Sequence, residues 1–221
     1  MTHHQIVKPV SLRRKRTQSG LEAIEFGLWA LLVAPAFVWM FISGIGFVRL
    51  NKASDVTRSA AMMYMKGSNM MTPGSQAILQ RVASGLDLQA VTGGTTLVNN
   101  AGSGLIVLTK IQYLGACSCT NANNYVIMQR IYIGNRSLQI GGSTVESFSG
   151  PVSVALWSSV TGDVANYTSD TAARSGAGVQ ALWSNSLSNG QVIYVVETFV
   201  RTPSFGSGEF DSRGIYNRVF M

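Results

Sequence analysis

One uncharged run of apolar residues constrains this chain more than any other feature of its sequence. It extends from Phe26 to Val48, and none of its 23 residues is charged. An α-helix rises about 1.5 Å per residue, so the run would be roughly 34 Å long, against a hydrocarbon core of about 30 Å in a bilayer. The sequence therefore predicts a membrane-spanning helix over residues 26–48.

A cleaved secretory signal is the main alternative to a retained span. Ala34 and Ala36 form an Ala-x-Ala pattern of the kind found at signal cleavage sites. The apolar residues continue for twelve positions beyond Ala36, however, whereas the apolar region of a signal ends close to its cleavage site. We therefore expect the span to be retained.

The net charge of +7 is concentrated before the span. Five positive charges and no acid occur among the first 20 residues, so the remainder carries 7 − 5 = +2. These five residues are Lys8, Arg13, Arg14, Lys15 and Arg16. A nucleic-acid surface would instead spread its basic residues over a folded face and interleave them with aromatics. We predict no nucleic-acid partner and interpret the basic leader as a topology signal.

The basic leader also orients the predicted span. Segments rich in Lys and Arg beside a span stay in the cytoplasm, which places the residues after Arg49 outside. The far side of the span carries Arg49, Lys52 and Arg58, partly offset by Asp55, so the charge asymmetry is incomplete. The predicted topology is a single span with a cytoplasmic N-terminus.

The predicted helix continues beyond the span, from about residue 22 to residue 66. No Gly or Pro occurs between Arg49 and Gly67, and Gly67 is suited to end the helix, while Pro35 is a point where it could kink. Apolar residues recur at spacings of three and four after the span: Leu50, Ala53, Val56, Ala60 and Met63. This apolar face packs either on the protein's own C-terminal part or on neighbouring subunits. Different portions of the helix can also pack in these two different ways.

Four residues stand at the entrance to the span: Gly20, Leu21, Glu25 and Phe26. A lone carboxylate close to the hydrocarbon is costly, which makes Glu25 a candidate functional residue; the plainer interpretation is a charge at headgroup level. With the basic leader before it, the arrangement resembles the processing site of type IV prepilins. The resemblance implies that a membrane aspartyl peptidase cuts after Gly20 on the cytoplasmic side. It further implies an often N-methylated terminus at Leu21 and an assembly role for the glutamate at mature position five.

A longer segment narrows the resemblance. The stretch from Leu21 to Gly67 is similar to the TadE-like family, which are pseudopilins or minor pilins of the tight-adherence (Flp) pilus system. Near the C-terminus, "GQVIYVVETFVRTP" and "GIYNRVFM" resemble that family's late strand and closing segment. Phe26 stands where many members of the wider group have tyrosine, and Gly46 where TadE-like proteins often have a carboxylate. A sibling pseudopilin is therefore the alternative within the group.

The resemblance also implies partners and a location. The partners would be a prepilin peptidase, the major Flp-type pilin and other pseudopilins, an inner-membrane assembly platform and the lipid bilayer. The protein would lie in the bacterial inner membrane with a periplasmic head, or would be associated with the pilus at the cell surface. Its role would be to prime, cap or anchor pilus assembly.

The sequence as a whole predicts an α+β fold. A long N-terminal transmembrane and stalk helix carries a head, and the head has an antiparallel β-sheet and a short helix. Thr72 as N-cap and Pro73 at N1 begin the short helix. One face of it is expected to carry Ile78, Leu79, Val82 and Leu86. Residues 92–103 are expected to form a loop or weak strand.

The strands of the head are expected where β-branched and aromatic residues are bounded by Gly and Asn, at residues 104–115, 124–134 and 190–200. At least one of them should be buried on both faces, and residues 151–157 are a shorter candidate. The expected organisation is a leader (1–20), a long helix (21–66), a connector with the short helix and a loop (67–103), and a β-rich head (104–221).

Enzyme chemistry is not expected. The only histidines are His3 and His4 in the leader, so the external part lacks a His-based triad and any His metal ligand. Glu209 and Asp211 could serve a glycosidase, but two acids in a Gly-Ser-rich loop are usually solvated. We predict that the protein is not an enzyme and uses neither a cofactor nor a metal.

Cys117 and Cys119 are the only cysteines. A structural zinc site would need two further ligands, and an oxidising compartment favours a disulfide. A bridge between residues two apart requires a turn. A local disulfide is the first interpretation, and free thiols or a bridge between subunits are the alternatives.

Two functions from different classes remain. The first is a processed pseudopilin that acts in pilus assembly. The second is an unprocessed single-span protein whose head is a binding or adhesion module. Only the first predicts a mature protein that starts at Leu21.

Overall fold

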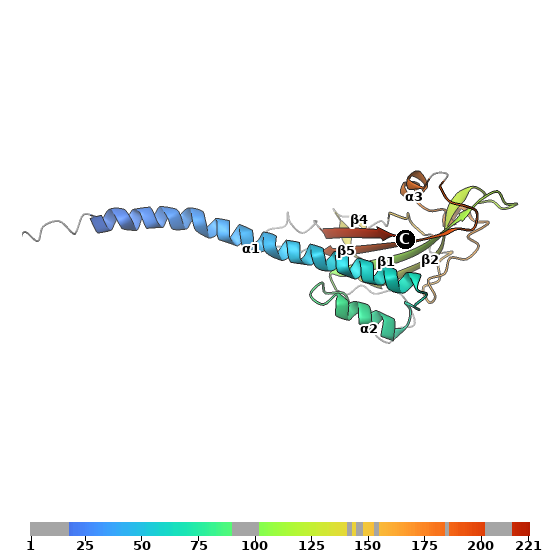
Figure 1. Ribbon diagram of the computed structural model, residues 1–221, viewed down its shortest axis with the longest axis horizontal. Coiled ribbons are helices and arrows are strands. Elements are labelled where there is room, and N and C mark those ends of the chain that lie inside the picture. The colour runs from blue at the N-terminus through green and yellow to red at the C-terminus, as the bar shows by residue number, and fades with distance from the viewer. Residues whose placement is uncertain are drawn as a thin grey trace, which may run out of the picture. The chain divides into compact units, whose positions relative to one another are not determined.

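The computed structural model describes residues 18–89, 102–140, 143–144, 148–152, 155–183, 186–201 and 214–221 (Figure 1). The basic leader with Arg13, Arg14, Lys15 and Arg16 lies outside the described residues, as do His3, His4, Glu209, Asp211 and most of the expected 92–103 loop. The chain forms two units, an N-terminal unit that ends at Gly46 and a C-terminal unit that spans Phe47–Met221.

One helix, α1, extends from Gln18 to Met65 and contains Pro35. It begins a turn earlier than the sequence predicts and ends where a glycine was expected to stop it. Gly67 has a φ of 77° and donates its amide to the Tyr64 carbonyl at 3.1 Å, while the Ser68 amide donates to the Met63 carbonyl at 3.0 Å. These two bonds form a Schellman motif, which satisfies carbonyls that a helix end would leave free.

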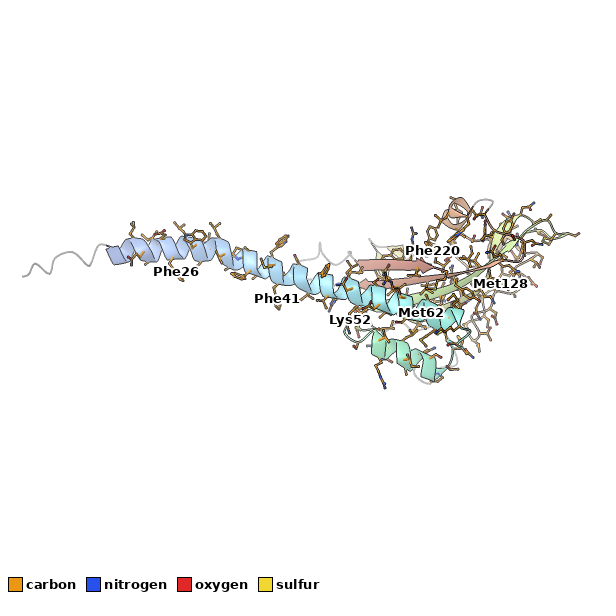
Figure 2. All side chains as sticks on the ribbon, viewed as in Figure 1. Phe26, Phe41, Lys52, Met62, Met128 and Phe220 are labelled. Atoms are coloured by element: carbon orange, nitrogen blue, oxygen red, sulfur yellow. A yellow bond between two sulfur atoms is a disulfide. The ribbon has the colours of Figure 1, made fainter. Side chains whose placement is uncertain are left out.

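In the N-terminal unit, α1 presents apolar side chains around its whole circumference, as the sticks in Figure 2 show. Phe26 is 76% exposed and Trp39 is 73% exposed. Among the described residues, this is the one helix long and apolar enough to cross a membrane, and none of its most apolar window is buried by protein. A helix that is apolar on all sides needs an apolar surrounding, which a bilayer supplies.

The C-terminal unit is built on a four-stranded antiparallel sheet in the order β2-β1-β5-β6. Its strands are β1 (Gly104–Leu114), β2 (Asn124–Gly134), β5 (Val192–Arg201) and β6 (Gly214–Phe220). A separate pair joins β3 (Gln139–Ile140) and β4 (Ser143–Thr144). The α+β fold and the three main strands are thus confirmed, and the closing segment adds the edge strand β6.

The central strands β1 and β5 are buried on both faces, as the β-branched runs predict. The pairing of β1 with β2 shifts by one residue, because Lys110 faces Gln129 whereas Ile111 faces Ile127. Met128 is therefore the extra residue of a β-bulge, which bends the strand locally.

Within the C-terminal unit, the second half of α1 packs on one face of the sheet. Ala53, Val56 and Ala60 are buried as expected, and the Thr57 hydroxyl donates to Thr198 Oγ1 on β5 at 2.8 Å. Leu50 departs from the expectation, because it is 44% exposed. Leu50 lies about 10 Å along the helix from Thr57, and β5 ends about 10 Å beyond Thr198, the partner of Thr57. Leu50 is therefore level with the end of β5.

Met63, the last residue of the expected apolar stripe, is partly buried at the margin of the core. Ala61 and Tyr64 lie deeper, so the buried face of α1 is centred slightly to one side of the expected stripe. Over this portion the helix packs on the protein's own chain, which was one of the two interpretations of the stripe.

Helix α2 (Pro73–Val82) begins as predicted, because the Thr72 side chain accepts a hydrogen bond from the Ser75 amide. Leu79 is buried, but Ile78 is 54% exposed, so the prediction that Ile78 shares one apolar face with Leu79 is wrong. Gln76 takes the inner position and donates to the Met70 carbonyl at 3.2 Å. The helix also ends earlier than the stretch suggests, and Leu86 reaches the core from a turn instead.

The other face of the sheet is covered by residues 148–152 and 155–183, here called the covering segment, which include the 3-10 helix η1 (Thr171–Ala173) and helix α3 (Ala177–Leu182). The strand expected at 151–157 is wrong for the described residues of that stretch. Trp157 instead forms an isolated bridge with Val164, and its indole donates to the Arg130 carbonyl on β2 at 2.8 Å.

Candidate processing and assembly site

Gly20 and Leu21 lie in the first turn of the described part of α1. A Cβ added to Gly20 would meet nothing within 4 Å, so packing among the described residues does not require glycine here. Leu21 is 71% exposed. The described part of the chain therefore leaves the backbone at Gly20 open to approach from outside.

Glu25 lies on the same face of α1 as Leu21, one turn further on. Its side chain is exposed, and no described residue bonds with it. Phe26 follows directly and begins the uncharged run. The helix therefore brings Leu21, Glu25 and Phe26 together. The Glu25 carboxylate lies at the edge of a surface that is otherwise apolar. The structure places none of the leader arginines, which lie outside the described residues.

Cys117 and Cys119 are joined by a disulfide, with 5.3 Å between their Cα atoms. They lie in the loop between β1 and β2, which is held by Asn121. The Asn121 side chain donates to the carbonyls of Tyr167 at 2.8 Å and Asp170 at 2.7 Å. The bridge therefore sits on a turn that is already anchored to the covering segment.

Glu197 on β5 is buried, and sequence patterns did not identify its partners. Its carboxylate accepts hydrogen bonds from the Phe148 amide at 2.7 Å, from the Ser149 hydroxyl at 3.2 Å and from the Tyr216 hydroxyl on β6. A buried carboxylate is costly unless such donors surround it. Glu197 therefore ties the covering segment to two strands of the sheet.

Arg130 on β2 is the other fully buried charged residue near this segment. Its Nε donates to Thr109 Oγ1 on β1 at 3.2 Å, and its Nη1 donates to the Gly150 carbonyl. Gly150 has a φ of 86°, and a Cβ there would lie 2.6 Å from the Gly176 nitrogen. Glu197 and Arg130 thus hold the two sides of the turn at 148–150.

A polar cleft of about 530 Å³ opens beside the end of α1. Gln129 is fixed in it from two sides, because it accepts from the Tyr64 hydroxyl at 2.8 Å and donates to Asp163 Oδ1 at 2.9 Å. Lys110 also lines the cleft, and no described residue pairs with its ammonium group. Tyr194 contributes a ring that meets Tyr64 edge to face. These side chains come from separate segments, so no local sequence motif indicated that they share a cleft.

Burial raises the pKa of two tyrosines in these arrangements. For Tyr64 the main cause is its desolvation, to which Tyr194 and Asp163 add. For Tyr216 desolvation again comes first, and the neighbouring Glu197 charge adds to it. Both hydroxyls therefore remain protonated donors in neutral solution.

No group of three or more His, Cys, Asp or Glu side chains that could hold a metal ion occurs among the residues the structure describes. Comparison of the chain with protein-family models, with curated proteins and with solved structures gave no match.

Proposed function

We propose that this protein is a TadE-like pseudopilin, or minor pilin, that acts in the assembly of a tight-adherence pilus after cleavage following Gly20. One observation carries the proposal. A single uninterrupted helix holds Gly20, Leu21 and Glu25 exposed at the entrance to an uncharged apolar run that no other part of the described chain covers.

Cleavage would create the partner that Glu25 lacks. Hydrolysis after Gly20 frees the α-amine of Leu21, which is cationic and lies at the start of the span. Pairing of that amine with the Glu25 carboxylate of a neighbouring subunit offsets the cost of placing either charge close to hydrocarbon. The pair also fixes the axial register between two spans, which apolar packing alone leaves loose.

The same helix offers a competing pairing within one chain. Leu21 and Glu25 are four residues apart, so the amine and the carboxylate of one subunit also lie on one helix face. A pair within the chain would shield both charges and favour a subunit that stays in the bilayer. During assembly, this pair within one chain would be replaced by a pair between the Leu21 amine of one subunit and the Glu25 carboxylate of its neighbour.

The proposed partners follow from this role. They are a prepilin peptidase, the major Flp-type pilin and other pseudopilins, an inner-membrane assembly platform and the bilayer. The proposed location is the bacterial inner membrane, with a cytoplasmic N-terminus and a periplasmic C-terminal unit. We propose no enzymatic activity and no nucleic-acid partner.

N-terminal sequencing tests the proposal directly. The chain is purified from cells that contain a prepilin peptidase and from otherwise identical cells that lack it. We expect the purified chain to start at Leu21 in the first preparation, and to keep the residues before Leu21 in the second. An identical, unprocessed start in both would refute a processed pseudopilin.

A second candidate function rests on the polar cleft. An unprocessed single-span protein could use the cleft as a binding or adhesion module, with its fixed Gln129 and with Lys110, which pairs with no described residue. This alternative predicts that function survives when processing is blocked. The sequencing experiment therefore separates the two candidates as well.

A further inference from the structure

Basic side chains gather at one end of the C-terminal unit. Two contacts show which end this is: Thr57 bonds with Thr198, and the ring of Tyr64 meets that of Tyr194 edge to face. Higher numbers on α1 therefore meet lower numbers on β5. The end of β5 at Arg201 consequently lies at the level where α1 enters this unit, a few residues after Phe47.

The turn at 102–104 brings two arginines to this end. The Arg201 amide donates to the Ser103 carbonyl at 2.8 Å. Asn135 donates its amide to the Gly104 carbonyl at 2.8 Å and its side chain to the Gly102 carbonyl at 2.7 Å. Arg136 follows directly. Its guanidinium is held in place, 4.6 Å from the ring centre of Tyr132 and 4.5 Å from that of Trp157.

Helix α2 also ends at this end of the unit. The Lys52 ammonium on α1 donates to the carbonyl of Ser84 at 3.1 Å and to its hydroxyl at 3.2 Å, just beyond the last turn of α2. Lys52 is labelled in Figure 2. Arg81 is exposed in that last turn, and Arg49 precedes Lys52 by less than one turn of α1.

The charge at this end is unbalanced. Among the described residues, five basic residues gather there, Arg49, Lys52, Arg81, Arg136 and Arg201, against the acids Asp55 and Asp87, which gives 5 − 2 = +3 for that part of the chain. None of the five forms an ion pair with a described residue. At the opposite end, Lys66, Lys110 and Arg174 are set against Asp163 and Asp170, which gives 3 − 2 = +1.

The topology signal does not account for these charges. Basic residues that follow a span on its external side oppose the orientation set by the leader, so they need another reason to be there. The uncharged run ends at Val48, one residue before Arg49. If residues 26–48 cross a bilayer, this basic end starts at the level of the lipid headgroups.

We propose that this basic end of the C-terminal unit, here called the basal surface, binds the phosphates of anionic phospholipids. It is defined by Arg49, Lys52, Arg81, Arg136 and Arg201. The inference rests on the membrane span of the proposed function. Basic residues beside a span attract anionic headgroups over about one Debye length. The basal surface thereby holds the C-terminal unit against the membrane until the chain is extracted.

Hydrogen exchange of the full chain in lipid nanodiscs tests the proposal. One preparation contains phosphatidylglycerol and phosphatidylcholine, and the other contains phosphatidylcholine alone. We expect amides at 84–88, 102–104 and 135–137 to exchange roughly tenfold more slowly with the anionic lipid, and high salt to remove the difference. Amides at 115–123, at the opposite end, should exchange alike in both.

Matched variants assign the effect to the basal surface. Arg49→Gln with Arg81→Gln removes one partly exposed and one exposed charge there, and adding Arg136→Gln removes a third. Each step should shrink the effect of phosphatidylglycerol. The control, Lys66→Gln with Lys110→Gln, removes two charges elsewhere and should preserve it. Equal losses in both sets, or protection that does not depend on lipid charge, would overturn the proposal.

Two further readouts separate the remaining explanations. Inorganic phosphate is compared with chloride at equal ionic strength, and selective competition by phosphate would identify a phosphate site in place of a lipid surface. Incorporation of the chain into the discs is measured first. Failure to insert would count against both the proposed function and the basal surface, whereas insertion without any lipid effect would overturn the basal surface alone.

Discussion

At the scale of single residues, Glu25 separates processing from assembly. The peptidase is expected to act at Gly20 and the basic leader, so Glu25→Gln should still be cut. The amide keeps the shape of the side chain but removes the charge that pairs with the Leu21 amine. Loss of one member of a buried ion pair typically costs about 3–5 kcal/mol, which should strongly reduce incorporation into pili.

Glu22 supplies the matched control, because it is an exposed glutamate on the same turn of α1. Glu22→Gln should leave pili unchanged. Pili are counted by electron microscopy, and immunoblots confirm equal amounts of processed protein. Wild-type piliation by Glu25→Gln would make Glu25 a charge at headgroup level and refute the proposed pairing.

A substitution at Gly20 tests whether the peptidase requires glycine at the cleavage site. Gly20→Leu should leave a precursor about 20 residues longer on a gel, because a side chain would keep a peptidase cleft from approaching the backbone closely. Gly27→Leu is the control, since a Cβ at Gly27 also meets nothing within 4 Å in this chain. Normal processing of the Gly20 variant, with the peptidase present, would contradict the prepilin interpretation.

Tyr216 tests the buried carboxylate. Tyr216→Phe removes one of the donors to Glu197 and should lower the free energy of unfolding by about 1.5–3 kcal/mol, the range for hydrogen bonds to charged groups. Urea denaturation measures the change. Tyr167→Phe serves as a control, and an equal loss in that variant would show that the contact with Glu197 is not the cause.

Residues differ in how far sequence alone can assign them. Glu25 stands out because a carboxylate beside an uncharged run is costly wherever the chain folds. Glu197 lies in a run that the sequence marks as a strand, but its donors at Phe148 and Ser149 are 48 or more residues away. Such partners depend on tertiary packing, which local patterns do not encode.

At the scale of elements, small residues let α1 lie close to the sheet. Ala60 has no measurable exposure. Ala60→Leu should destabilise the C-terminal unit by about 1–3 kcal/mol, because extra methylene groups have no space there. Ala77→Leu on the exposed face of α2 is the control and should change stability little. Similar denaturation midpoints for both variants would contradict close packing of α1 on β5.

The elements that sequence predicts best are those that local chemistry determines. Thr72 and Pro73 begin α2 because a side-chain cap and a missing amide suit that position in any context. The inner face of α2 depends instead on its neighbours, which place Gln76 inward and leave Ile78 in solvent. Residues 151–157 alternate as a strand would, but the Trp157 indole donates to the Arg130 carbonyl on β2, the edge strand of the sheet that its segment covers.

At the scale of the whole molecule, the long uncharged run and the β-branched runs were sufficient to predict a helix long and apolar enough to cross a membrane, followed by an α+β fold. The order of the strands was not predictable, because β5 joins β1 across 77 intervening residues, from 115 to 191. The polar cleft follows from that order. It gathers Lys110, Gln129 and Asp163 from segments whose sequences show no sign of a common site.

The pH dependence of folding is also a property of the whole C-terminal unit. Burial raises the pKa of Tyr64 above the value of 10.0 for an unperturbed tyrosine. A group whose pKa is higher in the folded state contributes stability that is fully present below its unfolded pKa. That contribution is lost as the pH rises through the folded pKa, because the unfolded chain loses the phenolic proton first. Stability should therefore start to decline near pH 10.

Tyr64→Phe tests this prediction, because phenylalanine has no proton to lose. Between pH 10 and the folded pKa, a buried tyrosine can steepen the fall in the free energy of unfolding by up to about 1.4 kcal/mol per pH unit. The variant should start lower at neutral pH, since it lacks the hydrogen bond to Gln129, and should then fall less steeply than wild type. Urea denaturation at several alkaline pH values measures both slopes. Parallel curves would show that the Tyr64 hydroxyl is not held protonated by burial against the sheet.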